Sequence, residues 1–285
     1  MHKISNKDKK NLLIEALSYI QKFKDKIIVI KYGGAAMVEE ELKIHFAQDI
    51  VLLQSLGLRP VVVHGGGPEV SRAMKQLGQE VSFIDGLRVT SAENMRVAEM
   101  VLSGMLNKEI IAHLNTFSGK AVGVSGKDGH LIEAYKKIHT SGVDLGYVGG
   151  IQKTNPELLH VLLDKGFLPV ISPIGLGVDG TTYNLNADTV ASCIAVALNA
   201  HKIIFMTDVD GIMVDETLQP ELTVGELRKL LEEGVIQGGM IPKAEAVLNS
   251  VSFGVPTAHI INGTDPHSVI SELFTDKGIG TQVVS

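Results

Sequence analysis

Short apolar runs rich in β-branched residues alternate along the chain with segments of helical periodicity. The runs, each of which predicts a strand, are KIIVIK (26–31), PVVVH (60–64), AVGVSG (121–126), LPVISPI (168–174), KIIFMT (202–207) and PTAHII (256–261). Two intervening segments carry apolar residues at helical spacing: Leu42, Phe46, Ile50, Leu53 and Leu56 in one, and Val97, Val101, Met105 and Ile110 in the other. This alternation predicts an α/β fold, a three-layer αβα sandwich with a central, mostly parallel sheet.

The charge of the chain narrows its possible partners. A formal net charge of −6 argues against nucleic acid or an anionic membrane surface as a bulk partner. The first residues are too charged for a secretory signal, and no apolar run reaches the length of a membrane span, so we expect a cytoplasmic protein. The single cysteine, Cys193, excludes a disulfide framework, and its apolar surroundings predict a buried structural thiol.

The N-terminal segment is predicted to form a helix that precedes the first strand. An apolar stripe runs along this helix and consists of Leu12, Leu13, Ala16, Leu17, Ile20 and Phe23. Packing within the subunit and contact between subunits both remain open for this stripe. The best candidate for a boundary between two lobes lies near residues 199–201, so we expect an N-terminal helix (1–24), a first lobe (25–199) and a second lobe (200–285).

Two of the predicted strands end in glycine-rich loops. Lys31 ends the first and is followed by Gly33 and Gly34, whereas His64 ends the second and is followed by residues 65–67, all glycine. In open parallel sheets the ligand binds beyond the carboxyl ends of the strands, and glycines let backbone N–H groups face an anion there. Tight turns would explain one glycine in each loop but explain three in a row poorly. The loops therefore predict an anion cradle with a lysine charge beside it, and His64 is expected to pack at the strand end.

Two further stretches carry polar residues suited to a site. In YNLNAD, Asn184, Asn186 and Asp188 share one face if the segment is extended, and a capping role would explain Asp188 alone. In GGMIPKAEA, Pro242 suits the first position of a helix and places Lys243 in the first turn. A lysine there opposes the helix dipole unless an anion lies nearby. A solvated surface lysine remains the alternative for Lys243.

The motifs, taken in order, resemble the amino acid kinase family. They are IKYGGAAM, VVVHGGGPEV, DGLRVT, LNKEI, VDLGYVGGI, SPIGLGVDGTTYNLNADTVA, TDVDGI and GGMIPKAEA, and the resemblance runs from about residue 10 to the C-terminus. Within the family the chain is most similar to the enzymes that transfer the γ-phosphoryl group of ATP to the γ-carboxylate of N-acetyl-L-glutamate in arginine biosynthesis. It departs from them at Ala35, where asparagine is commoner, and at Thr264, where arginine is common.

The resemblance implies a role for each site residue. Residues 25–199 would bind the amino acid and form a dimer, and residues 200–285 would bind ATP. The implied catalytic residues are Lys31, Lys243, Asp188, Gly34 and Gly67, with Asp188 holding the two lysines in place. The implied substrate-binding residues are Gly66, Gly67, Arg88, Asn184 and Asn186, and those for the nucleotide are Lys31, Asp208, Gly239, Met240 and Lys243. Mg²⁺ would arrive as MgATP, held mainly by the phosphates, and no protein metal site is expected.

The resemblance also implies regulation by the end product. In the branch of the family that arginine inhibits, a similar N-terminal helix joins dimers into a hexamer. The implied arginine site comprises Tyr19, Lys202, His267, Glu272 and Gly278.

Several alternatives to this function remain open within the family and outside it. An aspartokinase or a glutamate 5-kinase would be expected to carry an additional C-terminal domain, and a uridylate kinase would not require Arg88 and the YNLNAD stretch as an amino-acid clamp. A non-catalytic arginine-binding regulator with the same fold is a further hypothesis from another class.

Overall fold

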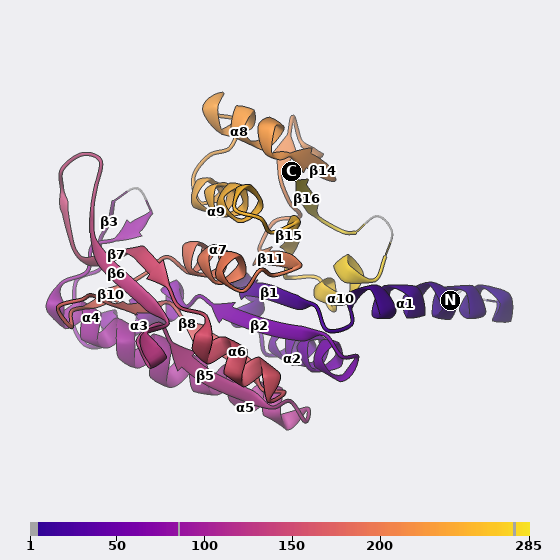
Figure 1. Ribbon diagram of the computed structural model, residues 1–285. Helices are drawn as coiled ribbons and strands as arrows, with labels where there is room; N and C mark the ends of the chain where they lie inside the picture. Colours follow the sequence, from indigo (N-terminus) through magenta and orange to yellow (C-terminus); the bar gives the residue numbers. More distant parts are fainter. Residues whose placement is uncertain (1–4, 85, 276–277) are drawn as a thin grey trace.

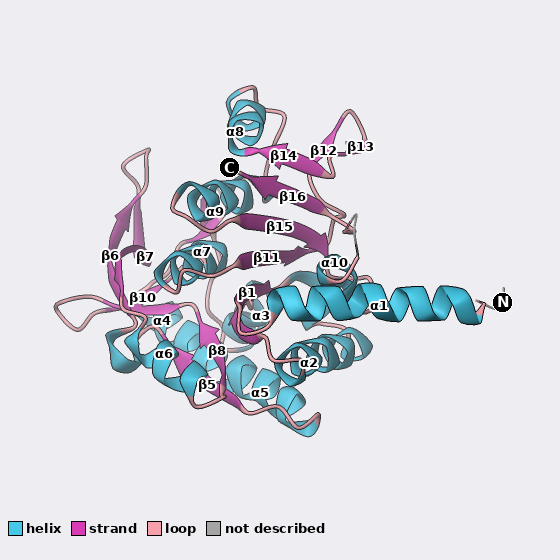
Figure 2. Ribbon diagram, turned by 45° about the vertical axis from the view of Figure 1, so that its right-hand side comes forward, coloured by secondary structure: helices cyan, strands magenta, loops and turns pink. Residues whose placement is uncertain are grey.

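The structure is a computed structural model that describes residues 5–84, 86–275 and 278–285. Within these residues, eight strands form one sheet in the order β14-β16-β15-β11-β1-β2-β8-β5, most of which can be followed in Figure 2. The strands are β1 (Ile27–Tyr32), β2 (Arg59–His64), β5 (Ala121–Ser125), β8 (Leu168–Ser172), β11 (Lys202–Thr207), β14 (Glu221–Thr223), β15 (Thr257–Asn262) and β16 (Thr281–Val284). Neighbouring strands run parallel except β15 and β16, which are antiparallel. All the predicted strands are present, although LPVISPI breaks at Pro173 into β8 and a short strand β9 (Ile174–Leu176).

Helices cover both faces of the sheet, as Figure 1 shows. One face carries α2 (Glu40–Ser55), α3 (Gly67–Gln76), α4 (Ala92–Glu99), α5 (Asn107–Thr116) and α10 (Ser268–Leu273). The other carries α6 (Glu157–Asp164), α7 (Ala187–Ala197), α8 (Val224–Glu232) and α9 (Met240–Ser252). Two short 3-10 turns lie in the connections: η1 (Gly34–Met37) follows β1, and η3 (Asp128–His130) follows β5. This arrangement confirms the predicted three-layer αβα sandwich.

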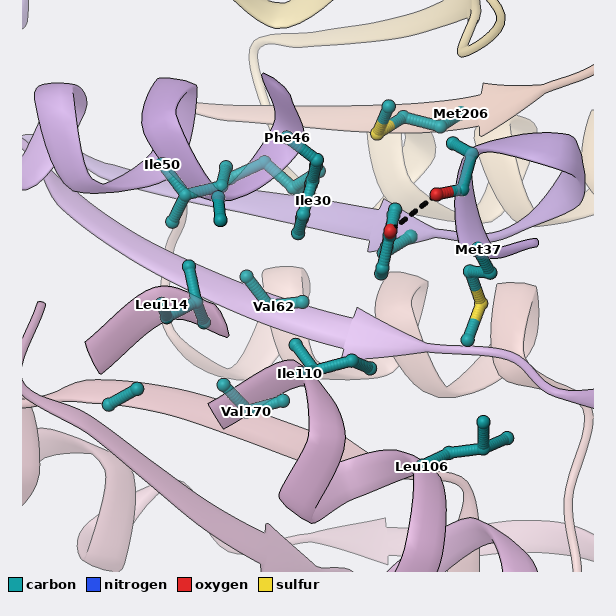
Figure 3. Close-up of a cluster of buried hydrophobic side chains, with 14 of the residues drawn as sticks. Ile30, Met37, Phe46, Ile50, Val62, Leu106, Ile110, Leu114, Val170 and Met206 are labelled. Atoms are coloured by element: carbon teal, nitrogen blue, oxygen red, sulfur yellow. Dashed lines mark hydrogen bonds between the residues drawn. The ribbon is translucent and has the colours of Figure 1, made fainter. Parts of the chain in front are cut away.

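The hydrophobic core consists of two layers because alternate residues of each strand face opposite sides. On β1, Ile28 and Ile30 join the layer under α2 and α5, and Val29 joins the layer under α7 and α9. Figure 3 shows part of the first layer, where the labelled side chains of Ile30, Phe46 and Val62 lie among those of Ile50, Ile110, Leu114 and Val170. These side chains are almost fully buried, so the central strands are held rigidly and their carboxyl ends form a fixed platform.

A second, smaller group of strands extends from one end of the sandwich. Strand β9 pairs with β6 (Ile132–Ile138) and β10 (Thr182–Asn184), and both of these pair with β7 (Asp144–Thr154), so the four strands close into a ring. Two short hairpins, β3 (Phe83–Ile84) with β4 (Leu87–Arg88) and β12 (Met213–Val214) with β13 (Thr217–Leu218), lie outside the main sheet. Strand β10 follows the GLGVDG stretch and leads to α7, so this ring positions the YNLNAD segment.

The helical segment after α4 winds more loosely than predicted. Residues Met100–Leu106 form a π-helix, η2, which continues directly into α5. Val97, Val101 and Ile110 are buried as expected, but Met105 is 53% exposed. The prediction for Met105 was wrong because each π turn takes up an extra residue, which brings Leu102 and Leu106 to the inner side instead.

The first helix, α1 (Asn6–Phe23), projects away from the sandwich in Figures 1 and 2. Phe23 at its end is buried in the core, whereas Ile14 and Leu17 are 55% and 57% exposed. The side chains of Leu12 and Leu13, which belong to the predicted stripe, lie outside the described part of the chain, as do residues 1–4 of the predicted N-terminal part. No helix in the described residues has the length and apolar character needed to cross a membrane.

Candidate active site

A cavity of about 290 Å³ lies beyond the carboxyl ends of β1 and β2. Its walls come from both glycine loops, the β3–β4 hairpin and the segment between β10 and α7. The structure brings together here most of the residues that the sequence singled out: Lys31, Gly33, Gly34, Gly65, Gly66, Gly67, Arg88, Asn184, Asn186 and Asp188. The cavity thus occupies the place that the ligand rule for open parallel sheets predicts.

Two lysines share one buried carboxylate at this cavity. Lys31 Nζ lies 3.2 Å from Asp188 Oδ1, and Lys243 Nζ lies 3.2 Å and 3.3 Å from Asp188 Oδ1 and Oδ2. Lys243 is only 5% exposed, so the alternative prediction of a solvated surface lysine is wrong. Helix α9 begins at Met240, two residues before the predicted start, so Pro242 is its third residue and Lys243 still lies in the first turn.

The ionisation of this cluster follows from its burial and its charges. Burial alone would raise the pKa of Asp188, but the Lys31 and Lys243 ammonium groups outweigh it and hold that pKa below its usual range. Burial, followed by the repulsion of Lys31, lowers the pKa of Lys243 to about 8. Asp188 is therefore ionised at neutral pH and unsuited to act as a base, whereas the two lysines present positive charge.

The segment before α7 is arranged differently from the simple extended strand that was predicted. Asn184 ends β10, but Asn186 is the N-cap of α7, and its Oδ1 accepts a hydrogen bond of 2.9 Å from the Thr189 backbone N–H. Asp188 is the second residue of the helix, so the capping role belongs to Asn186. All three side chains still line the cavity.

Gly66 and Gly67, adjacent in the second glycine loop, differ in the space around them. Gly66 has φ +146°, and a Cβ there would lie 2.3 Å from Leu106 Cδ1 and 2.8 Å from Leu102 Cδ2. A Cβ on Gly67 would find its nearest atom at 3.9 Å, Arg88 Nη2. The protein itself therefore excludes a side chain at Gly66, whereas at Gly67 the side chain would only fill space that faces the cavity.

The first loop is shaped by the polar groups around it. A Cβ on Gly33 would lie 2.4 Å from Lys31 Nζ, so this glycine leaves room for the lysine to fold back over the loop. Gly34 has φ +74°, and a Cβ there would lie 2.2 Å from Asp208 Oδ1. The same Asp208 oxygen accepts a hydrogen bond of 2.5 Å from the Ala35 backbone N–H. Asp208, at the end of β11, thus fixes the loop that follows β1.

Arg88 reaches the cavity from the short β3–β4 hairpin. Its Nη2 donates to the Gly67 carbonyl at 2.8 Å and to Ser71 Oγ at 2.7 Å, and its guanidinium lies 4.6 Å from the centre of the Phe83 ring. Burial lowers the pKa of Arg88 from its very high ordinary value, which leaves the side chain charged. A guanidinium held in this way is suited to pair with a carboxylate.

Three of the residues predicted to bind the nucleotide lie directly after β11 and at the start of α9. Gly239 is the residue before α9, and Met240 begins that helix, whose Lys243 reaches Asp188. Gly239 and Asp208 are exposed, and Met240 is half-buried. These three residues do not line the 290 Å³ cavity itself.

The residues predicted to bind free arginine are only partly brought together. Lys202 Nζ lies 2.8 Å from His259 Nε2, and His259 Nδ1 lies 2.5 Å from Glu272 Oε1. Glu272 also accepts hydrogen bonds from the backbone N–H groups of Ile279 and Gly280, and Gly278 has φ +62° close to its carboxylate. Burial lowers the pKa of Lys202 to about 8.

Tyr19 and His267 are the other two residues predicted to bind arginine. Tyr19 stacks with Phe23 at a ring distance of 6.2 Å, and the Phe23 ring lies 5.8 Å from Lys202 Nζ. His267 instead contacts α2, where its Nδ1 lies 2.6 Å from Asp49 Oδ1. His259 was not among the predicted residues, although a histidine inside the apolar run PTAHII needs a buried partner and so could have been singled out from the sequence.

The chain resembles known proteins over nearly its whole length. The amino acid kinase family profile matches residues 26–262. Two curated relatives are named acetylglutamate kinase: one from Desulforamulus reducens is 51% identical and covers 99% of both chains, and one from Methanocaldococcus jannaschii is 52% identical and covers 97% of this chain and 96% of its own.

Solved structures resemble the whole sandwich. N-acetylglutamate synthase from Neisseria gonorrhoeae, complexed with coenzyme A and N-acetyl-glutamate, has a TM-score of 0.87 at 29% identity over 97% of this chain. This chain spans 63% of the length of that synthase. Carbamate kinase from Giardia lamblia bound to AMP-PNP shares the fold, with a TM-score of 0.69 at 17% identity over 92% of this chain and 99% of its own. The profile match and the near-full-length relatives show that this chain is a kinase that belongs to the amino acid kinase family.

Proposed function

We propose that this kinase transfers the γ-phosphoryl group of ATP to the γ-carboxylate of N-acetyl-L-glutamate, which gives an acyl phosphate in arginine biosynthesis. The observation that carries the proposal is the pair of lysines on Asp188 beside a cavity that also holds two glycine loops and Arg88. Relatives that carry the name acetylglutamate kinase at about half identity support the choice of acceptor. So does the synthase whose structure contains N-acetyl-glutamate.

The chemistry of this transfer suits the groups at the site. An oxygen of the acceptor carboxylate forms a bond to the γ-phosphorus while the bond to the bridging oxygen of ADP breaks. A carboxylate is already a nucleophile at neutral pH, so no general base is needed. The obstacle is the approach of two anions, and catalysis then consists mainly of positioning and charge stabilisation.

The lysine cluster is proposed to supply that stabilisation. Lys31 and Lys243 neutralise charge on the phosphoryl group as it moves, and the backbone N–H of Gly34 assists them. Asp188, whose pKa is held low by the two lysines, orients both ammonium groups without exchanging a proton. Removing one such donor typically costs on the order of a hundred- to a thousand-fold in rate.

The acceptor is proposed to lie against the second loop. Backbone N–H groups of Gly66 and Gly67 receive the γ-carboxylate, and Arg88 pairs with the α-carboxylate. Asn184 hydrogen-bonds the acetamido region, and Asn186, which caps α7, supports this wall.

The nucleotide is proposed to lie over the second lobe, residues 200–285, next to Asp208, Gly239 and Met240. Mg²⁺ would enter with ATP. Its ligands would come mainly from the phosphates and water, as is usual for Mg²⁺ that arrives with ATP. Among the described residues no group of three or more His, Cys, Asp or Glu side chains is arranged to hold a metal ion. Bound there, the ion would neutralise phosphate charge.

Regulation and assembly form a second part of the proposal. We infer that α1 joins dimers of the first lobe, residues 25–199, into a hexamer, because this helix projects from the sandwich and both Leu17, which belongs to the predicted stripe, and the neighbouring Ile14 are more than half exposed. Arginine would bind between this helix and the Lys202–His259–Glu272 network, with Tyr19, His267 and Gly278 as further members of the site. The related synthase was also solved with L-arginine, at 28% identity, and this chain covers 65% of it.

A coupled assay that measures ADP release tests the acceptor. The protein is incubated with ATP and, in parallel, N-acetylglutamate, glutamate, aspartate or UMP, and a Lys243→Ala preparation reports contaminating activity. Release of ADP with N-acetylglutamate alone is the expected result. Turnover of another acceptor without turnover of N-acetylglutamate would refute the proposal.

A further inference from the structure

His64 is a fully buried histidine that ends β2 and directly precedes the second glycine loop. Its Nδ1 lies 2.7 Å from the Gly65 carbonyl oxygen, and its Nε2 lies 3.2 Å from Asn107 Nδ2. Asn107 is 1% exposed and begins α5, directly after the π-helix. A histidine and an asparagine therefore meet in the apolar core, immediately behind one wall of the cavity.

The hydrogen-bond partners assign the tautomer of His64. Asn107 Nδ2 donates to the Val170 carbonyl at 3.0 Å, and Asn107 Oδ1 accepts from Lys108 Nζ at 3.1 Å, so the orientation of this amide is fixed at both ends. Its nitrogen can only donate to His64, which makes Nε2 the acceptor. The ring proton then lies on Nδ1 and is donated to the Gly65 carbonyl.

The neutral form of the ring is maintained across the physiological range. Burial, with a smaller contribution from the Lys108 charge, lowers the pKa of His64 to about 4 against the opposing effect of the Gly65 bond. The donor to Gly65 is therefore present at any pH at which the enzyme would work. Both ring nitrogens are engaged by Gly65 and Asn107, so His64 holds its neighbours in place rather than exchanging a proton with a substrate.

The bond to Gly65 determines where the next amide points. In a planar trans peptide the carbonyl of one residue and the N–H of the next point in opposite directions. When His64 draws the Gly65 carbonyl toward the core, the N–H of Gly66 is turned the other way, toward the cavity that residues 65–67 line. The preceding peptide is fixed as well, because the Gly65 N–H donates to the Tyr32 carbonyl at 2.8 Å.

The surrounding chain is shaped to accept this polar pair. A Cβ on Gly123 would lie 1.8 Å from Asn107 Oδ1, so β5 makes room for the amide at this position. Apolar side chains could fill such a space without the cost of burying polar groups. A fully satisfied polar pair instead specifies one orientation of the groups it contacts.

We propose that His64 and Asn107 are positioning residues that aim the Gly66 N–H at the acceptor carboxylate. The proposal rests on the proposed function, in which this N–H receives the γ-carboxylate. Neither residue contacts the substrate: His64 acts through the Gly65 carbonyl, and Asn107 acts through His64.

A graded set of variants tests the proposal. His64→Leu removes the donor to Gly65. His64→Asn places an amide nitrogen where Nδ1 stood and is the conservative variant that restores the donor. Asn107→Leu removes the group that selects the tautomer but leaves the Gly65 bond available. His139→Leu, a buried histidine outside the cavity lining, is the matched control.

The readout is the separate KM for acceptor and for ATP, together with kcat. We expect His64→Leu to raise the KM for the acceptor and so to lower kcat/KM for the acceptor on the order of tenfold or more, while the KM for ATP changes little. His64→Asn and Asn107→Leu should fall between His64→Leu and the wild type, and His139→Leu should match the wild type. If His64→Leu does not fold, the two milder variants must still raise the acceptor KM selectively.

The possible failures are distinguishable. If the wild type phosphorylates a different acceptor, the proposed function fails and the same variants are measured with that acceptor. If both KM values change in parallel in every folded His64 and Asn107 variant, or neither changes, the positioning role is refuted. Failure of His64→Asn to recover acceptor kcat/KM relative to His64→Leu would also overturn it.

Discussion

Replacing Gly66 or Gly67 with alanine should separate stability from catalysis within one loop. The two glycines are adjacent and both line the cavity, yet their surroundings differ. At Gly66 an added Cβ would meet Leu106 at 2.3 Å and Leu102 at 2.8 Å, with φ at +146°. At Gly67 the nearest atom to the Cβ would be 3.9 Å away, at an ordinary contact distance.

The expected magnitudes follow from these contacts. A non-glycine residue in a sparsely populated backbone region costs about 1–3 kcal/mol, and overpacking against the two leucines costs about 1–3 kcal/mol more. Gly66→Ala should therefore destabilise the protein by about 2–6 kcal/mol, which for a chain of this size lowers Tm by about 4–12 °C. Gly67→Ala should change the free energy of unfolding by less than about 1 kcal/mol. It should nevertheless reduce kcat/KM for the acceptor about a hundred-fold, because its methyl group displaces the carboxylate.

Thermal unfolding of the protein without substrates, followed by circular dichroism, measures the first quantity, and the ADP-release assay measures the second. A double-mutant cycle with Leu106→Ala divides the Gly66 effect into its two parts. Removing the leucine should relieve part of the overpacking and leave the backbone strain. Equal loss of Tm in the two glycine variants, or wild-type turnover by Gly67→Ala, would refute the reasoning.

Three further perturbations test other parts of the molecule. Lys243→Ala should lower kcat on the order of a hundred- to a thousand-fold while ATP still binds in a calorimetric titration; unchanged turnover would remove this lysine from the mechanism. Because the pKa of Lys243 is lowered to about 8, its ammonium form is lost as the pH rises through that value, so kcat/KM should fall above about pH 8; a profile that stays flat to pH 9.5 would contradict this. Deletion of residues 1–24 should convert a hexamer to dimers in light scattering and weaken inhibition by arginine, and a truncated protein that remains hexameric would exclude the role given to α1.

The fold was predictable because its signals are local. Uninterrupted apolar runs such as KIIVIK and KIIFMT became central strands, since only strands buried on both faces tolerate such patterns. The β6–β7 hairpin was not predicted, because its mixed polar and apolar residues are only partly buried and show no clear alternation. Met105 was misplaced for a different reason: a π-helix changes the helical period, and the sequence carries no local signal for that change.

The site was predictable as a set of residues but not as a geometry. The resemblance to the family implied that Asp188 would lie between Lys31 and Lys243, and the structure places all three side chains together. The structure was needed to show that Asn186 rather than Asp188 caps α7, because both residue types serve equally well as caps. The different demands on Gly66 and Gly67 depend on a backbone angle and on leucines far along the chain, neither of which a run of three glycines reveals.

The stoichiometry of the lysine cluster has a consequence for how the protein responds to its medium. Two ammonium groups face one carboxylate, so these three side chains together carry one surplus positive charge in a nearly dry setting. This net positive charge should attract the phosphate groups of a nucleotide substrate. Small inorganic anions such as sulfate are attracted by the same charge but cannot react. We therefore expect them to compete with the substrate phosphates and to weaken nucleotide binding as their concentration rises.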